Sequence, residues 1–233
     1  MEQKETIVNE KKNGWPRNGH ETEFELLLSH RLPGLATSTP QAKSIFGNEE
    51  KEIVIAHHFK KIMEALGLNL KDDSLKDTPK RVAKMFVREI FSGLDPKNKP
   101  AVTLFDNKFS YNQMLVEKDI SFYSNCEHHF VPFTGKAHVA YISSGKVIGL
   151  SKLNRIVQYH AHKPQLQERL TVEIAAELKQ VLQTEHVAVI IEAQHHCVMA
   201  RGIKDANSKT VTAEYLGLFL QAEYKNEFQF HLK

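Results

Sequence analysis

The spacing of apolar residues along this chain predicts helices followed by strands, and then a second run of helices followed by strands. Apolar side chains three and four positions apart are typical of amphipathic helices, whereas β-branched and aromatic runs are typical of strands. Helices are expected at 48–66, 78–92, 151–161 and 164–183. Strands are expected at 101–105, 114–123, 136–142, 187–198 and 208–218. Because the strands come in groups, this order predicts an α+β fold rather than a dinucleotide-binding βαβ unit.

The first 47 residues differ from the rest of the chain. They are polar and show little periodicity, so we expect residues 1–47 to form a mobile N-terminal extension with at most a helical turn at 24–28. The remainder divides into an N-terminal helical segment, 48–100, and an α+β domain, 101–233. Thr78 is the expected N-cap of the second helix, with Pro79 at its first position.

Composition excludes several classes of protein. The 233 residues are 41% hydrophobic and 25% charged, which is typical of a globular chain with a sizeable core. A net charge as small as +3 gives no indication of nucleic-acid binding. The aliphatic run at 187–191 is far too short to cross a bilayer, and the first residues lack the apolar segment of a secretory signal. We therefore expect a cytoplasmic protein that binds neither nucleic acid nor a membrane.

Cysteine and histidine gather in two short segments. Cys126 and His129 stand in a C-x-x-H relation, which lets one turn present two ligands to one metal ion. Cys197, the only other cysteine, directly follows two histidines. A Cys₂His set without a fourth ligand is typical of a catalytic zinc site, whose open position holds a water. The alternative is a pair of buried free thiols beside surface histidines, but the histidine-rich flanks of both cysteines favour the metal.

The last strand-like segment before Cys197 allows a prediction about its two histidines. Side chains alternate between the two faces of a strand. If the strand at 187–198 is unbroken, His195 shares the face of Cys197 and His196 points the other way. We therefore expect His195 beside the metal.

The helix expected at 151–161 begins with an unusual charge pattern. Ser151 is a good N-cap, but Lys152 and Arg155 place cations in the first turn, where the helix dipole disfavours positive charge. A bound anion such as phosphate would resolve this conflict. The alternative is a set of solvated surface cations. Further basic residues that could join such a site are Arg81, Lys84 and Arg201.

An amide and a carboxylate lie side by side at the start of the next helix. Gln167 and Glu168 could together read the polar edge of a purine, because a fixed carboxylate accepts well from the donors of guanine. Glu168 alone could equally be explained by the helix dipole, which favours a carboxylate in the first turn.

Five motifs in order resemble the GTP cyclohydrolase I family, and the similarity extends over about 48–219. They are Cys126-Glu127-His128-His129, Val139-Ala140-Tyr141-Ile142, Val147-Ile148-Gly149-Leu150-Ser151-Lys152, Gln167-Glu168-Arg169-Leu170-Thr171, and His195-His196-Cys197 followed by Arg201-Gly202. One departure is His162-Lys163-Pro164, where the family more often has an arginine.

This resemblance implies a tunnelling fold, in which an antiparallel sheet carries helices on one side, with 101–233 as the catalytic domain. It implies a homodecamer with active sites at subunit interfaces. The implied reaction converts GTP and water to 7,8-dihydroneopterin triphosphate and formate, the first step of tetrahydrofolate and pterin biosynthesis.

The resemblance also implies roles for individual residues. The zinc ligands would be Cys126, His129 and Cys197. The catalytic residues would be His128 and His195 as acid and base, with Ser151 near the ribose. The triphosphate would be held by Ser151, Lys152, Arg155 and Arg201, with Arg81 and Lys84 from the helical segment, and guanine by Gln167 and Glu168.

Two other functions remain as alternatives. One is a zinc-free enzyme of the same fold, such as the nitrile reductase of queuosine synthesis, which uses a nucleophilic cysteine and a nicotinamide cofactor. The C-x-x-H motif and the second cysteine argue against it. The other is a zinc-stabilised binding module without catalysis, which needs neither a histidine beside the metal nor cations at the start of a helix.

Overall fold

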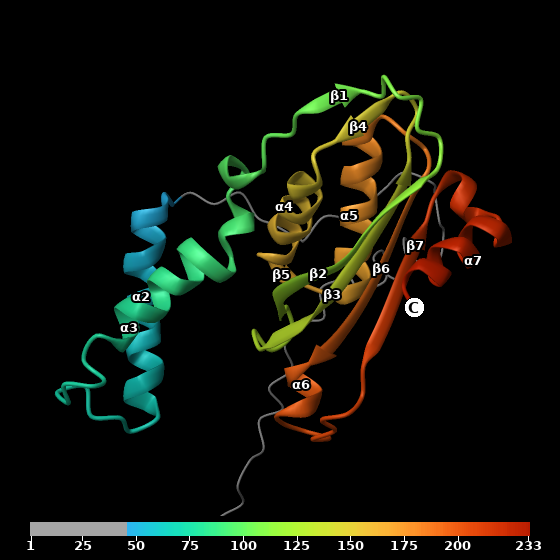
Figure 1. The fold of residues 1–233 in the computed structure, drawn as a ribbon. Coiled ribbons are helices and arrows are strands. Elements are labelled where there is room, and N and C mark those ends of the chain that lie inside the picture. Colours follow the sequence, from blue (N-terminus) through green and yellow to red (C-terminus); the bar gives the residue numbers. More distant parts are fainter. Residues whose placement is uncertain (1–45) are drawn as a thin grey trace, which may run out of the picture. The chain divides into compact units, whose positions relative to one another are not determined.

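The computed structural model describes residues 46–233 (Figure 1). The helical turn predicted at 24–28, and all of the predicted extension except 46–47, lie outside the described residues. The helices are α2 (Asn48–Ala65), α3 (Thr78–Met85), α4 (Leu150–Ala161), α5 (Gln167–Leu182), α6 (His196–Met199) and α7 (Ala222–His231). A π-helical turn, η1 (Phe86–Ile90), follows α3, and shorter 3₁₀ turns are η2 (Ser92–Leu94), η3 (Pro96–Asn98) and η4 (Gly217–Leu220).

The strands form one five-stranded sheet and one small ribbon. They are β1 (Leu104–Asp106), β2 (Met114–Cys126), β3 (Pro132–Ile142), β4 (Lys146–Ile148), β5 (Pro164–Gln165), β6 (Val187–His195) and β7 (Thr210–Tyr215). The large sheet has the order β5-β2-β3-β6-β7, and β1 pairs with β4. All pairs are antiparallel except β2 with the two-residue β5. The predicted α+β fold with an antiparallel sheet is therefore confirmed.

The main core lies between the sheet and helices α4 and α5, which run along one of its faces (Figure 1). On β6, Val187, Val189 and Ile191 point into this core and are fully buried. Burying a side chain of this size stabilises the fold by about 1.5–3 kcal/mol. The apolar period of β6 therefore determines which face receives the two helices.

A smaller core lies on the opposite face of the sheet. Ala188 and Ile190 of β6 pack there with Phe219 of η4 and Phe228 of α7. Helix α7 is not among the helices expected from the sequence, and it covers part of the face that the prediction leaves without helices. This contact explains why β6 is apolar at both odd and even positions.

The end of β6 corrects one prediction. The strand stops at His195, and 196–199 form the helical turn α6, so the predicted strand at 187–198 is too long. The last pair between β3 and β6 joins Phe133 to His195. The residue before Phe133 is Pro132, which has no N–H and cannot continue the hydrogen-bond ladder. Cys197 therefore does not lie on the strand, and the alternation argument that placed it on the face of His195 is wrong.

The starts of three helices also differ from expectation. Neither Thr78 nor Ser151 is an N-cap: α3 follows Asp77 and α4 follows Gly149, and no side chain caps either helix. The predicted helix at 164–183 begins only at Gln167, because the two residues of β5 pair with β2. Pro79 stands in the first turn of α3 but is its second residue rather than its first, because the helix begins at Thr78. Among residues 46–233, no helix is long and apolar enough to span a membrane.

A buried charged cluster holds β5 in place beneath α5. The Glu173 carboxylate accepts hydrogen bonds from Gln165 Nε2 at 2.8 Å and His160 Nδ1 at 3.0 Å, and from Lys163 Nζ at 3.3 Å. All four side chains are buried. Burial raises the pKa of Glu173, but the hydrogen bond from His160 and the charge of Lys163 outweigh it and lower the pKa to about 2.

We expect the Glu173→Gln variant to lose stability at neutral pH and to match the wild type in strong acid. A carboxyl whose pKa falls from 4.5 to about 2 on folding contributes about 3 kcal/mol above pH 4.5. That contribution is lost as the pH falls from about 4.5 to 2. Urea unfolding across this range measures it. The control is Glu192→Gln, which removes an exposed partner of Lys209. A stability difference that does not change with pH contradicts the prediction.

Candidate functional site

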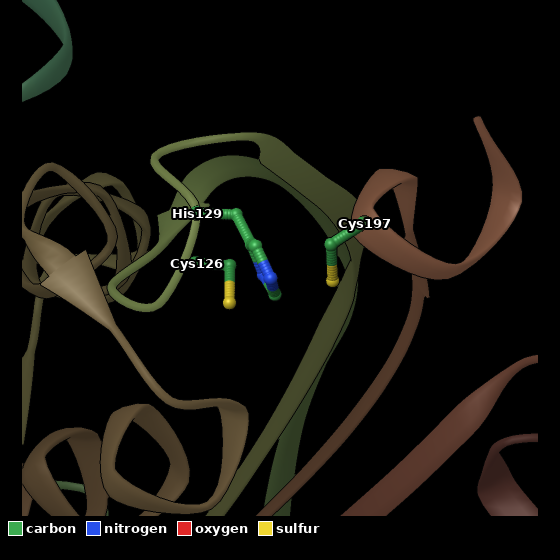
Figure 2. A group of neighbouring side chains, drawn as sticks. All are labelled: Cys126, His129 and Cys197. Atoms are coloured by element: carbon green, nitrogen blue, oxygen red, sulfur yellow. The ribbon is translucent and has the colours of Figure 1, made fainter. Parts of the chain in front are cut away.

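Three potential metal ligands from distant parts of the chain meet at one end of the sheet. Cys126 is the last residue of β2, His129 lies in the turn that follows, and Cys197 belongs to α6. Their ligand atoms all lie within 4.8 Å of one another. Figure 2 shows Cys126 and His129 extending from the same turn, with Cys197 beside them. The structure thus brings together the three residues that the sequence predicts as ligands.

The turn after β2 is closed by its own backbone. Phe130 N donates to Cys126 O at 2.8 Å, and Cys126 N donates to Val131 O at 2.9 Å. Asn125 Nδ2 also donates to Phe130 O at 3.2 Å. Phe130 adopts a positive φ of 54°, which lets the chain reverse within these few residues. The C-x-x-H spacing therefore places both side chains on one tight turn.

The chemistry of the three residues fits a metal cation. Two thiols and an imidazole are ligands that zinc and other borderline-soft cations prefer. Burial raises the pKa of the Cys197 thiol, and the neighbouring Cys126 raises it further. A divalent cation between them would reverse this effect, because it favours both thiolates. Ligand atoms around tetrahedral zinc lie roughly 3.5–3.8 Å apart, so small side-chain movements suffice to close the site.

Two further predicted residues contact the three potential ligands Cys126, His129 and Cys197, which we call the metal group. His128 Nδ1 is 3.8 Å from Cys126 Sγ, and Arg201 Nη1 is 3.0 Å from His129 Nε2. Both His128 and Arg201 are exposed to solvent. Arg201 is thus a cation next to the metal group, where it can also meet an anionic ligand.

His195 is held by a buried amide. Its Nε2 lies 2.8 Å from Gln167 Oε1, while Gln167 Nε2 lies within 3.0–3.1 Å of the carbonyl oxygens of Thr210 and Ile191. Carbonyl oxygens only accept, so the amide nitrogen of Gln167 must face them and its oxygen must face His195. His195 therefore donates from Nε2, which leaves Nδ1 as its other ring nitrogen.

The surroundings of His195 favour its neutral form. The ring stacks on Phe133, with centroids 4.7 Å apart and planes within 4°. Burial lowers the pKa of His195, and the negative charge of Glu168 opposes this shift. His195 directly precedes α6, the element that carries Cys197. His195 is therefore near the metal group, but through the end of a strand rather than through strand alternation.

Gln167 and Glu168 lie in the first turn of α5, where the sequence places them. Their environments differ. Gln167 is 1% exposed and its amide nitrogen is bonded within the chain, whereas Glu168 is exposed. Glu168 is thus the member of the pair whose polar group is open to a ligand.

The remaining predicted substrate-binding residues lie on other elements. Ser151, Lys152 and Arg155 are in the first turns of α4, and Lys152 Nζ donates to Ala101 O at 2.7 Å. Arg81 and Lys84 are exposed on α3, which packs against α2. Within residues 46–233, no hydrogen bond or ion pair connects either group to the metal ligands.

The sequence interpretation missed one ion pair next to the site. Arg169 of α5 binds Glu127, the residue after Cys126, through both carboxylate oxygens. Each residue belongs to one of the motifs quoted above, and their opposite charges were a signal that could have found the pair.

Comparison with known proteins gives a consistent result. The family model for GTP cyclohydrolase I matches residues 55–233. A Flavobacterium johnsoniae protein named GTP cyclohydrolase 1 is 55% identical over 186 residues, which cover 80% of this chain and 83% of that protein. Proteins of the same name from Aeromonas salmonicida and Vibrio vulnificus are 49% and 46% identical. These two alignments cover 89% and 85% of this chain, and 96% and 91% of the relatives.

Proposed function

The chain belongs to the GTP cyclohydrolase I family, and from this premise we propose that it converts GTP and water to 7,8-dihydroneopterin triphosphate and formate. This is the first step of tetrahydrofolate and pterin biosynthesis. The observation that carries the proposal is the meeting of Cys126, His129 and Cys197 beside an oriented His195. The test is incubation of the purified, metal-analysed protein with GTP, followed by detection of formate and of a fluorescent oxidised pterin.

We propose zinc as the metal, held by Cys126, His129 and Cys197. Zinc with an open position supplies a Lewis acid and lowers the pKa of a coordinated water to about 7. A reducing compartment such as the cytoplasm keeps the two thiols available as ligands, and we place the enzyme there.

The two histidines are proposed to handle protons. His195 donates from Nε2 to Gln167, so in the neutral ring Nδ1 carries no proton: it first takes one from the attacking water and then passes it to the ring nitrogen of guanine when the bond to C8 breaks. His128, exposed beside Cys126, is the second acid or base. The hydroxyl of Ser151 serves the later rearrangement of the ribose.

Substrate binding is proposed to use the exposed polar groups. The exposed Glu168 accepts from the donors of guanine; the adjacent Gln167, also predicted to bind guanine, is buried and its side chain is bonded to His195. Lys152, Arg155 and Arg201 bind the triphosphate. Its negative charge compensates the positive charges of Lys152 and Arg155 near the start of α4, where the helix dipole disfavours cations.

Arg81 and Lys84 suggest how subunits cooperate. They lie on α3, which has no bond to the metal group within residues 46–233. We propose that they bind triphosphate at the site of a neighbouring subunit, as in a homodecamer with active sites at its interfaces. Residues 48–100 are then a helical segment that completes the catalytic domain, 101–233, of another copy.

We expect replacement of Lys152, Arg155 or Arg201 by alanine to weaken GTP binding by about 10- to 150-fold. A charged hydrogen bond to phosphate contributes about 1.5–3 kcal/mol. Guanosine binding should change little, because guanosine carries no phosphate. Dissociation constants for both ligands measure the difference, and the control is Lys179→Ala, at an exposed ion pair near the other end of α5. Equal losses for GTP and guanosine would refute the assignment.

A further inference from the structure

We propose that Glu127 and Arg169 are positioning residues, whose ion pair holds the metal-binding turn against the first turn of α5. The proposal rests on the proposed metal site and adds two residues to it. Neither residue is a metal ligand, and neither is proposed to touch GTP. Their role is to keep Cys126 and His129 in the arrangement that a metal needs.

The geometry of the pair is specific. Arg169 Nη1 donates to Glu127 Oε2 at 2.6 Å, and Nη2 donates to Oε1 at 3.1 Å. The two parallel hydrogen bonds fix the orientation of both planar groups, which a single contact does not. The Arg169 side chain is 5% exposed and that of Glu127 is 24% exposed. The pair is therefore shielded from water on the Arg169 side, where screening by solvent is weak.

Glu127 is held from two sides. Its backbone N–H donates to Gln165 O of β5 at 3.1 Å, and its carboxylate binds Arg169 of α5. Cys126 precedes Glu127, and His129 follows two residues later on the same turn. A shift of Glu127 must therefore move one or both of these ligands.

The first turn of α5 serves both halves of the site. Gln167 holds His195 at the end of β6, and Arg169, two residues later, holds the turn after β2. The helix is anchored by Leu170 and Ile174, which are fully buried in the main core. A rigid element thus sets the position of the metal-binding turn relative to His195.

The test is zinc affinity, measured by competition with a chelator on the purified full-length protein. We expect Glu127→Gln and Arg169→Lys each to weaken zinc binding by about 10- to 100-fold, because partners that orient metal ligands have effects of this size. Glu127→Gln nearly preserves shape, and Arg169→Lys preserves charge but cannot form both hydrogen bonds. The matched control is Lys179→Gln, which removes an exposed ion pair from the same helix.

Two further measurements separate positioning from general destabilisation. Cobalt substituted for zinc should show an altered absorption spectrum in both variants. The free energy of unfolding of the metal-free proteins, measured in urea, should change less than the free energy of zinc binding. The exchanged pair, Glu127→Arg with Arg169→Glu, should recover part of the zinc affinity lost by either single exchange. Unchanged zinc affinity and cobalt spectrum in Glu127→Gln and Arg169→Lys would overturn the proposal.

The outcome is distinguishable from failure of the proposed function. A wild-type protein that binds one metal ion per chain but does not convert GTP contradicts the function and still tests the positioning role. A wild-type protein that binds no metal overturns both.

Discussion

Replacement of Cys126 or Cys197 by serine should remove the metal and the enzymatic activity together. Each change leaves only two of the three ligands that the turn after β2 and α6 bring within 4.8 Å of one another. Because the metal is bound only by ligands in their deprotonated form, losing one thiolate sharply lowers affinity. We expect substoichiometric zinc and no detectable pterin product. Metal analysis and turnover on the same preparations measure both quantities.

The chain is well suited to this experiment because Cys126 and Cys197 are its only cysteines. Each variant therefore contains a single thiol, which can be titrated to show that the remaining ligand has become accessible. His138→Asn is the matched control, because it changes a histidine on β3 outside the metal group. Stoichiometric zinc with normal turnover in either serine variant would show that the site is misassigned.

Replacement of His195 by alanine should lower kcat by about 10²- to 10⁴-fold and leave bound zinc near the wild-type level. A general acid typically contributes a rate factor in this range. His195 is not one of the three residues that could hold the metal, and its ring is placed by Gln167 and Phe133. The measurements are kcat and zinc content for wild type and variant side by side.

The adjacent histidine provides the comparison. His196 is the first residue of α6, and His196→Ala should cost little activity. The expectation no longer depends on strand alternation, since β6 ends between the two histidines. If His196→Ala proves the more damaging change while the fold is intact, the assignment of the acid to His195 is wrong.

Local patterns were sufficient for much of the fold. The apolar repeats that predicted α4 and α5 lie at the positions that pack on the sheet, and the aliphatic run at 187–191 forms the first five residues of β6. Such patterns are reliable because a long periodic segment has one face to bury, whichever element covers it. Helix α7 was missed because Phe228 is the only residue of this helix that is buried.

Element ends were less predictable, because they depend on partners far away in the sequence. β6 ends at His195 since its neighbour β3 begins at Pro132, which no feature of 187–198 reveals. β5 has only two residues and exists as a strand through its pairing with the end of β2. For the same reason the helix predicted at 164–183 was placed three residues too early at its start, since α5 begins only at Gln167.

The sequence by itself determined which side chains could carry the chemistry. The C-x-x-H spacing, the second cysteine and the adjacent histidines are covalent facts, and two ligands three residues apart can share one turn in any fold. Tertiary structure alone decided how these groups are oriented. It placed Cys197 on a helical turn, buried Gln167 against His195 while leaving Glu168 exposed, and joined Glu127 to Arg169. These orientations depend on contacts between residues 28 to 71 positions apart. Such contacts form, and stabilise the site, only after the sheet and α5 have packed together.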